Sequence, residues 1–112
     1  MIRPEIEELE RLGPLPTDDD DYPGIDQKLF DVEHLLAVVD PPVTVEEARV
    51  LAALFPRDGS TCYGLAWSLL HLIETLGVDD LRAVVPGVNS AQWRKMFEQR
   101  LENAEDPRRR AG

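Results

Sequence analysis

Helix-breaking residues divide this chain into short segments, and this punctuation constrains the fold more than any other feature. Prolines and glycines stand in or around residues 13–16, 23–24, 41–42, 56 and 86–87. Between them, apolar residues recur three or four positions apart, the spacing that places side chains on one face of an α-helix. No segment alternates apolar and polar residues, and no Asn-Gly or Asp-Gly turn joins two strand-like runs. The sequence therefore predicts an all-α fold, a compact bundle of four main helices with a short N-terminal helix and a helical turn.

Capping signals place the ends of the expected helices. Thr44 and Glu47 form a T-x-x-E capping box, in which hydroxyl and carboxylate satisfy the first free amides of a helix. The other expected starts are Pro4, a cap at Asp26, a cap at Ser60 or Thr61, Asp79, and a cap at Asn89-Ser90. The corresponding expected ends are Gly13, about Val39, Phe55 for the Thr44 helix, Leu76, Val85 and about Ala104.

Three regions follow from this division. Residues 1–24 hold a short helix and an acidic Pro/Gly linker, residues 25–106 a helical bundle domain, and residues 107–112 a disordered basic tail. The linker, residues 13–24, combines helix breakers with four consecutive aspartates, which favours an extended, mobile connection. We therefore expect the first helix to be loosely tethered.

The length and composition suit one hydrophobic core. The chain has 112 residues, of which 43% are hydrophobic and 30% charged, as in globular proteins. On the second helix the expected core face is Leu29, Val32, Leu35, Leu36 and Val39. On the fourth it is Cys62, Leu65, Ala66, Leu69, Leu72, Ile73 and Leu76.

Charge is unevenly distributed along the chain. Residues 1–58 hold fifteen acids and five bases, whereas residues 59–112 hold seven of each, so the whole formal charge of −10 lies in the first half. Such a surface repels phosphate backbones and attracts basic proteins. We expect a basic protein partner and no nucleic acid, although plain solubility also explains an acidic surface.

The sequence also indicates the cellular compartment of the protein. There is no apolar run of the roughly 18 residues needed to span a bilayer, and the first residues lack the pattern of a signal peptide. The only cysteine, Cys62, lies in an apolar segment, which suits a reducing compartment. Arg far exceeds Lys, and Ala, Val and Leu far exceed Ile and Asn, a bias typical of GC-rich coding. We expect a cytoplasmic, bacterial protein with no membrane association.

A second apolar stripe lies on the second helix, opposite its core face. It consists of Phe30, His34, Ala37 and Val38. An exposed patch of this kind needs a cover. The favoured cover is the N-terminal helix, through Ile6, Leu9 and Leu12. The alternative is a partner protein that binds Phe30, His34 and Val38, with Asp18, Asp19, Asp20 and Asp21 as a charged rim.

The fourth helix carries a comparable stripe, which is a candidate ligand pocket. Tyr63, Trp67, His71 and Glu74 recur at helical spacing. In a pocket, the aromatic rings would stack on a ligand while His71 and Glu74 move protons. The alternative, that these are boundary residues packing against the core, is favoured because aromatic residues at this spacing usually do so.

Other catalytic and metal sites find no support. Cys62 and His71 fall on opposite sides of one helix, which excludes a Cys-His pair. A metal site from Asp31, His34, His71 and Glu74 would require the second helix to turn its outer side inward. A calcium loop around Gly24 fails because Pro23 and Phe30 occupy ligand positions. Nucleotide-binding and hydrolase motifs are absent, so we assign no catalytic residue, metal or cofactor.

One segment resembles a known set of sequences. A set of small uncharacterised bacterial proteins is similar to this chain in one stretch of sequence. The stretch contains Cys62-Tyr63-Gly64-Leu65-Ala66-Trp67 and Leu70-His71-Leu72-Ile73-Glu74-Thr75, and Leu54-Phe55-Pro56 precedes it. The resemblance covers about a third of the chain. It implies a bacterial, cytoplasmic setting and assigns neither an activity nor functional residues to this chain.

These observations favour a small acidic protein-binding module that masks a more basic partner, as immunity proteins and anti-factors do. The alternative is a small-molecule-binding or hydrolytic protein whose pocket is walled by Tyr63, Trp67, His71 and Glu74. A homodimer through the stripe of the second helix, or through the Trp93/Phe97 face, is also compatible with the sequence.

Overall fold

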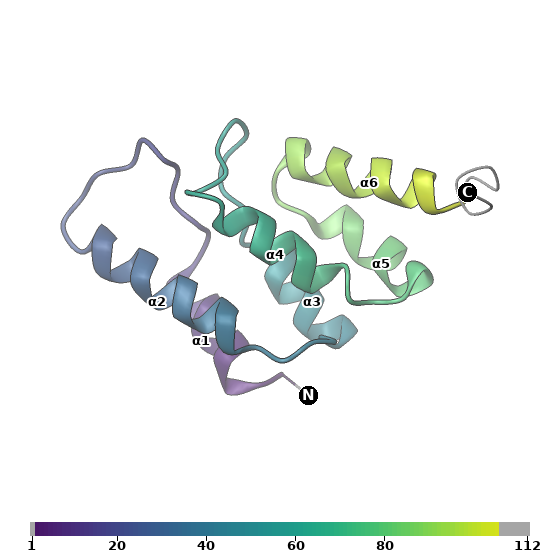
Figure 1. Ribbon diagram of the computed structural model, residues 1–112, viewed down its shortest axis with the longest axis horizontal. Coiled ribbons are helices and arrows are strands. Elements are labelled where there is room, and N and C mark those ends of the chain that lie inside the picture. The colour runs from purple at the N-terminus through teal and green to yellow at the C-terminus, as the bar shows by residue number, and fades with distance from the viewer. Residues whose placement is uncertain (1, 106–112) are drawn as a thin grey trace.

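The structure, a computed structural model, describes residues 2–105, and these residues form helices and loops without a strand. The helices are α1 (Pro4–Leu12), α2 (Ile25–Val38), α3 (Val45–Ala52), α4 (Leu65–Ile73), α5 (Val78–Val84), the 3₁₀ helix η1 (Val85–Gly87) and α6 (Ala91–Glu105) (Figure 1). The all-α prediction is confirmed for this part of the chain. The lengths do not set four main helices apart, because α1 and α4 have nine residues each and α3 has eight.

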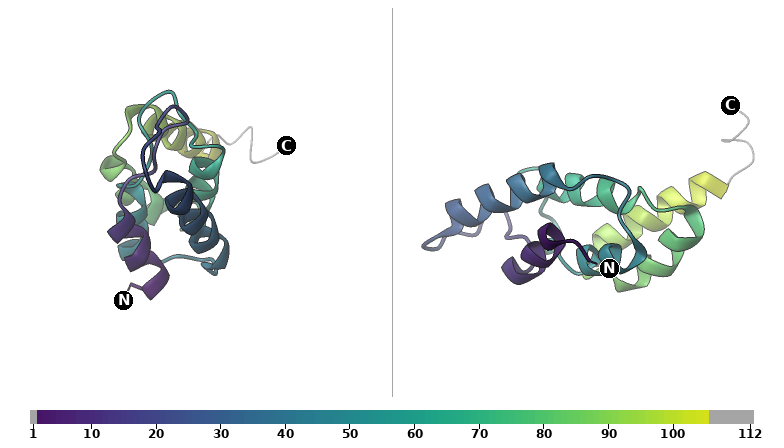
Figure 2. Two further views of the ribbon diagram at one scale, coloured as in Figure 1. Left: turned by 90° about the vertical axis from the view of Figure 1, so that its left-hand side faces the viewer. Right: turned by 90° about the horizontal axis from the view of Figure 1, so that it is seen from below.

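The helices are arranged along an elongated body of 49 × 32 × 23 Å. α1 and α2 lie side by side at one end, α5 and α6 lie at the other, and α3 and α4 lie between them (Figures 1 and 2). α1 packs against α2 and α3, and α3 in turn packs against α4 and α5. The two ends are therefore joined through α3 and α4, which occupy the centre of the core.

The predicted apolar face of the fourth helix is confirmed as core. Its members Cys62, Ala66, Leu69, Leu72 and Ile73 are buried, and Leu65 and Leu76 are partly buried against them. Leu70, on another side of α4, is also fully buried, so the helix is covered on more than one side. An aromatic cluster continues the core toward α6, where the ring of Trp93 stacks on Phe55 at 5.4 Å between centroids and meets Trp67 edge-on at 4.9 Å.

The capping box at the start of α3 is confirmed. The Thr44 hydroxyl accepts a hydrogen bond from the Glu47 amide at 3.1 Å, and the Glu47 carboxylate accepts one from the Thr44 amide at 2.9 Å. The cap predicted for α2 is wrong. The helix begins directly after Gly24, whose φ of 90° is accessible to glycine, and Asp26 lies inside the first turn.

The start predicted for α4 is also wrong. Cys62, Tyr63 and Gly64 have φ values of 50°, 53° and 87°, so these three residues form a left-handed turn and α4 begins only at Leu65. Left-handed backbone costs roughly 1 kcal/mol or more at a residue other than glycine, and surrounding contacts must hold it. The Ser60 hydroxyl accepts a hydrogen bond from the Cys62 amide, and the Asp18 carboxylate accepts one from the Tyr63 amide at 2.6 Å.

The linker between α1 and α2 is anchored to the body of the molecule, where the sequence predicted a loose connection. Leu15 is buried and its amide donates to the Leu54 carbonyl at 2.9 Å. The Asp18 amide donates to the Ser60 hydroxyl at 3.0 Å, and the Tyr63 hydroxyl donates to the Asp18 carbonyl at 2.9 Å. These bonds explain the difference, because they fix the linker to the body of the molecule despite the repulsion among its aspartates.

An ion pair that the sequence did not reveal ties α1 to α3. The Arg3 guanidinium donates to both carboxylate oxygens of Glu47, at 2.8 and 3.1 Å, and Glu47 is almost completely buried. Arg3 also donates to the carbonyl groups of Asp40 and Pro42. The hydrogen bonds from Arg3 hold the pKa of Glu47 at about 2. The start of α1 is thereby fixed to the start of α3.

Two sequence predictions are limited by the described range. The basic tail predicted for residues 107–112 lies outside the described residues. Within the described range, no helix combines the length and apolar character needed to cross a membrane.

Candidate functional site

The helix α2 has one buried side and one exposed side, and the exposed side is the candidate site. Val32 and Leu36 are buried, and Leu29 and Leu35 are partly buried against the core, as predicted. The opposite side keeps apolar surface in contact with solvent. Phe30 is 67% exposed and Val38 45%, and His34 and Ala37 are also exposed.

The N-terminal helix does not cover this face, so the sequence-based prediction that it would is wrong. Ile6 and Leu9 are buried, as expected of a docked helix, but they join the core cluster that includes Val32 and Leu36. The Arg3 and Glu47 pair explains the placement, because it holds α1 against α3 on the inner side of α2. The stripe through Phe30 is left unpartnered by α1.

The stripe borders a shallow hollow of about 260 Å³. Phe30, Glu33, His34 and Ala37 line it, so its surface is mostly apolar with one carboxylate at the edge. A neighbouring hollow of about 260 Å³ lies between α1 and α2 and is lined by Glu8, Asp31, His34 and Leu35. Glu8 was not among the residues predicted for this site, because nothing in its own sequence context indicates that α1 lies beside Asp31.

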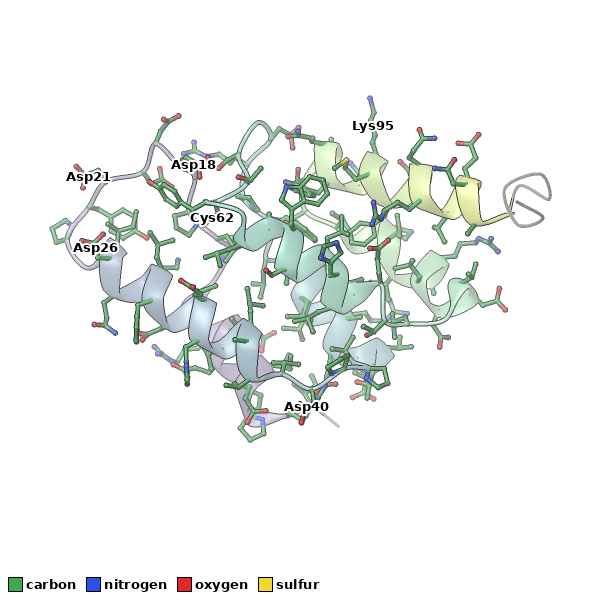
Figure 3. All side chains as sticks on the ribbon, viewed as in Figure 1. Asp18, Asp21, Asp26, Asp40, Cys62 and Lys95 are labelled. Carbon is green, nitrogen blue, oxygen red and sulfur yellow. The ribbon has the colours of Figure 1, made fainter. Side chains whose placement is uncertain are left out.

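The surroundings of the stripe are strongly acidic. Residues 5–40 hold twelve acids and two bases, Arg11 and Lys28. Arg11 pairs with Glu8, and the Lys28 ammonium donates to the Pro14 carbonyl at 3.2 Å. Figure 3 shows Asp18, Asp21 and Asp26 gathered at the end of the molecule where α2 begins, while Lys95 lies on α6 at a distance from them. The exposed apolar face of α2 therefore lies in the part of the sequence where acids most outnumber bases.

The four consecutive aspartates have different roles. Asp18 and Asp20 accept hydrogen bonds within the fold, Asp18 from the Tyr63 amide and Asp20 from the Thr17 amide at 2.8 Å. The bond from Thr17 lowers the pKa of Asp20, and Arg57 lies within ion-pair distance of the same carboxylate, at 3.4 Å. Asp19 and Asp21 are exposed to solvent. The predicted charged rim thus contains two residues that also shape the loop.

The second candidate site does not form the helical stripe that its spacing predicted. Tyr63 lies in the left-handed turn before α4, and its hydroxyl donates to the Asp18 carbonyl. Trp67 is partly buried, edge-on to Trp93. His71 is exposed, and the Glu74 carboxylate pairs with the Arg100 guanidinium. Tyr63, Trp67 and Glu74 therefore each contact a different part of the fold.

A larger hollow of about 680 Å³ lies elsewhere, between the linker, the loop after Phe55 and the start of α6. Its polar groups bond to one another. The Asp58 carboxylate accepts from the Ser90 hydroxyl, which lowers the pKa of Asp58, and the Asn89 amide group bonds the backbone of Phe55 in both directions. These groups organise the start of α6, and sequence reasoning gave no signal for this hollow.

Cys62 and the potential metal ligands of the described chain were the remaining candidates for reactive groups. Burial raises the pKa of the Cys62 thiol to about 11, so the thiol stays protonated at neutral pH. Among residues 2–105, no three His, Cys, Asp or Glu side chains are grouped so as to hold a metal ion.

Comparison with protein-family models, with curated proteins and with solved structures gave no match. The resemblance of the segment around Trp67 to small bacterial proteins stays a prediction.

Proposed function

We propose that this protein is a small acidic binding module that docks on a more basic protein and masks part of its surface, as immunity proteins and anti-factors do. The observation that carries the proposal is the exposed stripe of α2, where Phe30 stays 67% exposed although α1 packs on the same helix. Burying one such side chain gains roughly 1.5 to 3 kcal/mol, a gain that folding leaves unused here. A partner that buries the Phe30 side chain on binding gains this free energy.

Charge indicates the class of partner. The segment that contains α1, the linker and α2, residues 5–40, holds twelve acids and two bases. A basic protein is steered toward such a surface, and an acidic protein or a nucleic acid is repelled. The proposal also places the protein in the cytoplasm, where the unpaired thiol of Cys62 stays reduced.

The arrangement favours this function over a ligand pocket on α4. A pocket requires its side chains to converge on one concavity. Tyr63, Trp67 and Glu74 instead contact Asp18, Trp93 and Arg100, which lie in different parts of the chain.

The test is capture of partners by the tagged full chain from a lysate of the source organism, followed by purification of the captured protein and measurement of its affinity. Phe30→Asp is the test variant. Val78→Asp is the control, because Val78 is also an exposed apolar residue but lies at the start of α5, away from α2. Circular dichroism checks that both variants fold.

We expect a basic protein that binds the wild type and Val78→Asp equally and loses most of its affinity for Phe30→Asp. Raising NaCl from about 0.1 to about 1 M shortens the Debye length from about 10 to about 3 Å and should weaken binding strongly. Capture of no basic protein, or equal affinity for Phe30→Asp and wild type, would contradict the proposal.

A further inference from the structure

The two hollows beside α2 differ in chemistry and meet at one residue. The first offers the Phe30 ring and the Ala37 methyl, and the second offers the carboxylates of Glu8 and Asp31 above Leu35. His34 borders both. A ligand that fills the two hollows together therefore needs an apolar group and a cationic group in adjacent positions.

The charges that face the second hollow come from α1 and α2. Arg11 on α1 pairs with Glu8 and lies near Asp31. One Asp31 oxygen accepts from the Gln27 amide at 2.8 Å, and Glu33 adds a carboxylate on the other side of His34. Three carboxylates against one guanidinium leave the surface net negative, which selects a lysine or an arginine as the cationic group.

The shape of the surface indicates a helical ligand. With a rise of 1.5 Å per residue, the stripe from Phe30 to Val38 runs for about 12 Å along α2, or two helical turns. One common mode for an extended peptide is addition to a sheet edge, and residues 2–105 contain no strand that provides one. A helix satisfies its own backbone groups and can lie on an apolar face, with apolar and basic residues three or four positions apart.

A second copy of this chain is disfavoured as the occupant. A symmetric contact through α2 would place Glu8, Asp31 and Glu33 of two copies against each other, each copy carrying a formal charge of −10. Like charges facing each other across an interface oppose association by several kcal/mol.

We propose that the face formed by Phe30, His34 and Ala37 together with the Glu8 and Asp31 hollow binds a basic amphipathic helix of the partner. Its apolar residues pack on Phe30 and Ala37, and its lysine or arginine residues face Glu8 and Asp31. This inference rests on the proposed function and specifies the partner element. A two-turn contact is smaller than a standard interface, so the isolated helix should bind with a dissociation constant of about 1 to 100 μM.

The test uses the full chain labelled with ¹⁵N and three synthetic peptides of about 18 residues. The first forms a helix with leucines on one face and lysines beside them. The second has the same composition with two central residues replaced by proline, which prevents a continuous helix. The third carries glutamate in place of lysine.

We expect the first peptide to shift the amide signals of α2 and of the α1 residues around Glu8. The proline peptide should bind at least about tenfold more weakly. The glutamate peptide should not bind. Shifts centred elsewhere on the protein, or equal binding of the proline peptide, would overturn the inference.

Matched variants separate specific contact from general attraction. Phe30→Asp should abolish binding of the first peptide, while Val78→Asp should leave it unchanged. Asp31→Asn should weaken binding about three- to tenfold, whereas Asp80→Asn, which removes one charge from α5, should have little effect. Equal effects of Asp31→Asn and Asp80→Asn would show that only net charge matters and would overturn the inference.

Failure here is distinguishable from failure of the proposed function. If a purified basic partner depends on Phe30 but the helical peptide does not bind, the inference is wrong and the proposed function stands. If no basic partner is captured, the proposed function itself fails. A dimer detected by analytical ultracentrifugation and lost in Phe30→Asp would identify a second copy as the occupant and overturn the inference.

Discussion

Helices α2 and α4 carry the same local pattern but have different surroundings. Each has an aromatic residue followed four positions later by histidine, Phe30 and His34 on α2 and Trp67 and His71 on α4. On α4 the aromatic ring packs edge-on against Trp93 of α6. On α2 the ring remains 67% exposed. The pattern fixes which residues share a face, and only the tertiary arrangement decides whether another helix covers that face.

This difference indicates that separate parts of the molecule provide folding stability and a binding surface. Side chains around α4 contribute to folding because they are packed on several sides. The outer side of α2 contributes little to folding, so its residues are available for a partner. The following predictions test this separation.

The largest expected effect comes from truncating the two aromatic residues of the shared pattern. Trp67→Ala should reduce the free energy of unfolding by about 3 kcal/mol, because it removes a partly buried ring in contact with Trp93. Phe30→Ala should change it by no more than about 0.5 kcal/mol. Urea unfolding followed by circular dichroism measures both values. Similar losses for the two variants would mean that Phe30 is covered in solution, and the comparison would collapse.

The second prediction concerns the ion pair that holds α1 beside α2. The pKa of Glu47 is about 2 in the fold, below its ordinary value of 4.5, so the folded state binds this proton more weakly than the unfolded state. The resulting stability is fully present above about pH 4.5 and is lost as the pH falls toward 2, by at most about 3 kcal/mol. Glu47→Gln should remove that pH dependence and lower stability at pH 7 by about 2 kcal/mol.

Urea unfolding of wild type and Glu47→Gln between pH 2 and pH 7 checks the sign and the size of this effect. Glu98→Gln serves as the control for the loss of one carboxylate charge, because Glu98 is exposed on α6, away from α1 and α3. Amide hydrogen exchange adds a regional readout, since α1 packs against α2 and α3. Loss of the pair should speed exchange in α1 and α2 more than in α4. Equal acceleration of amide exchange in α2 and α4 would show that the docking of α1 does not stabilise α2 in preference to α4.

Much of this architecture was predictable because local patterns determine it. The capping box at Thr44 and the core faces of α2 and α4 follow from residue types at short spacing, and the structure confirms them. The predicted start of α4 failed because a distant residue, Asp18, helps to hold Tyr63 in a left-handed turn. Local capping rules do not include such a contact.

The candidate site was predictable only in part for the same reason. The stripe of Phe30, His34 and Val38 follows from helical periodicity, which predicts the face but not its cover. Its exposure depends on where α1 docks, and that docking depends on Arg3 reaching Glu47 across 44 positions of sequence. The proximity of Glu8 to Asp31 follows from the same docking.

The smallest expected effect tests the segment that connects the two compared regions. The Asp18 carboxylate, in the linker before α2, accepts from the Tyr63 amide in the turn before α4. Asp18→Ala should therefore lower the free energy of unfolding by about 1 kcal/mol, because a left-handed residue loses a charged acceptor. Asp21→Ala removes the same charge from an exposed position and should be neutral or slightly stabilising, since it reduces repulsion among the aspartates. Urea unfolding at low ionic strength measures both. Equal effects would mean that the aspartates act only as a charge cluster, whereas a difference assigns Asp18 to the fold and leaves Asp21 for a basic partner.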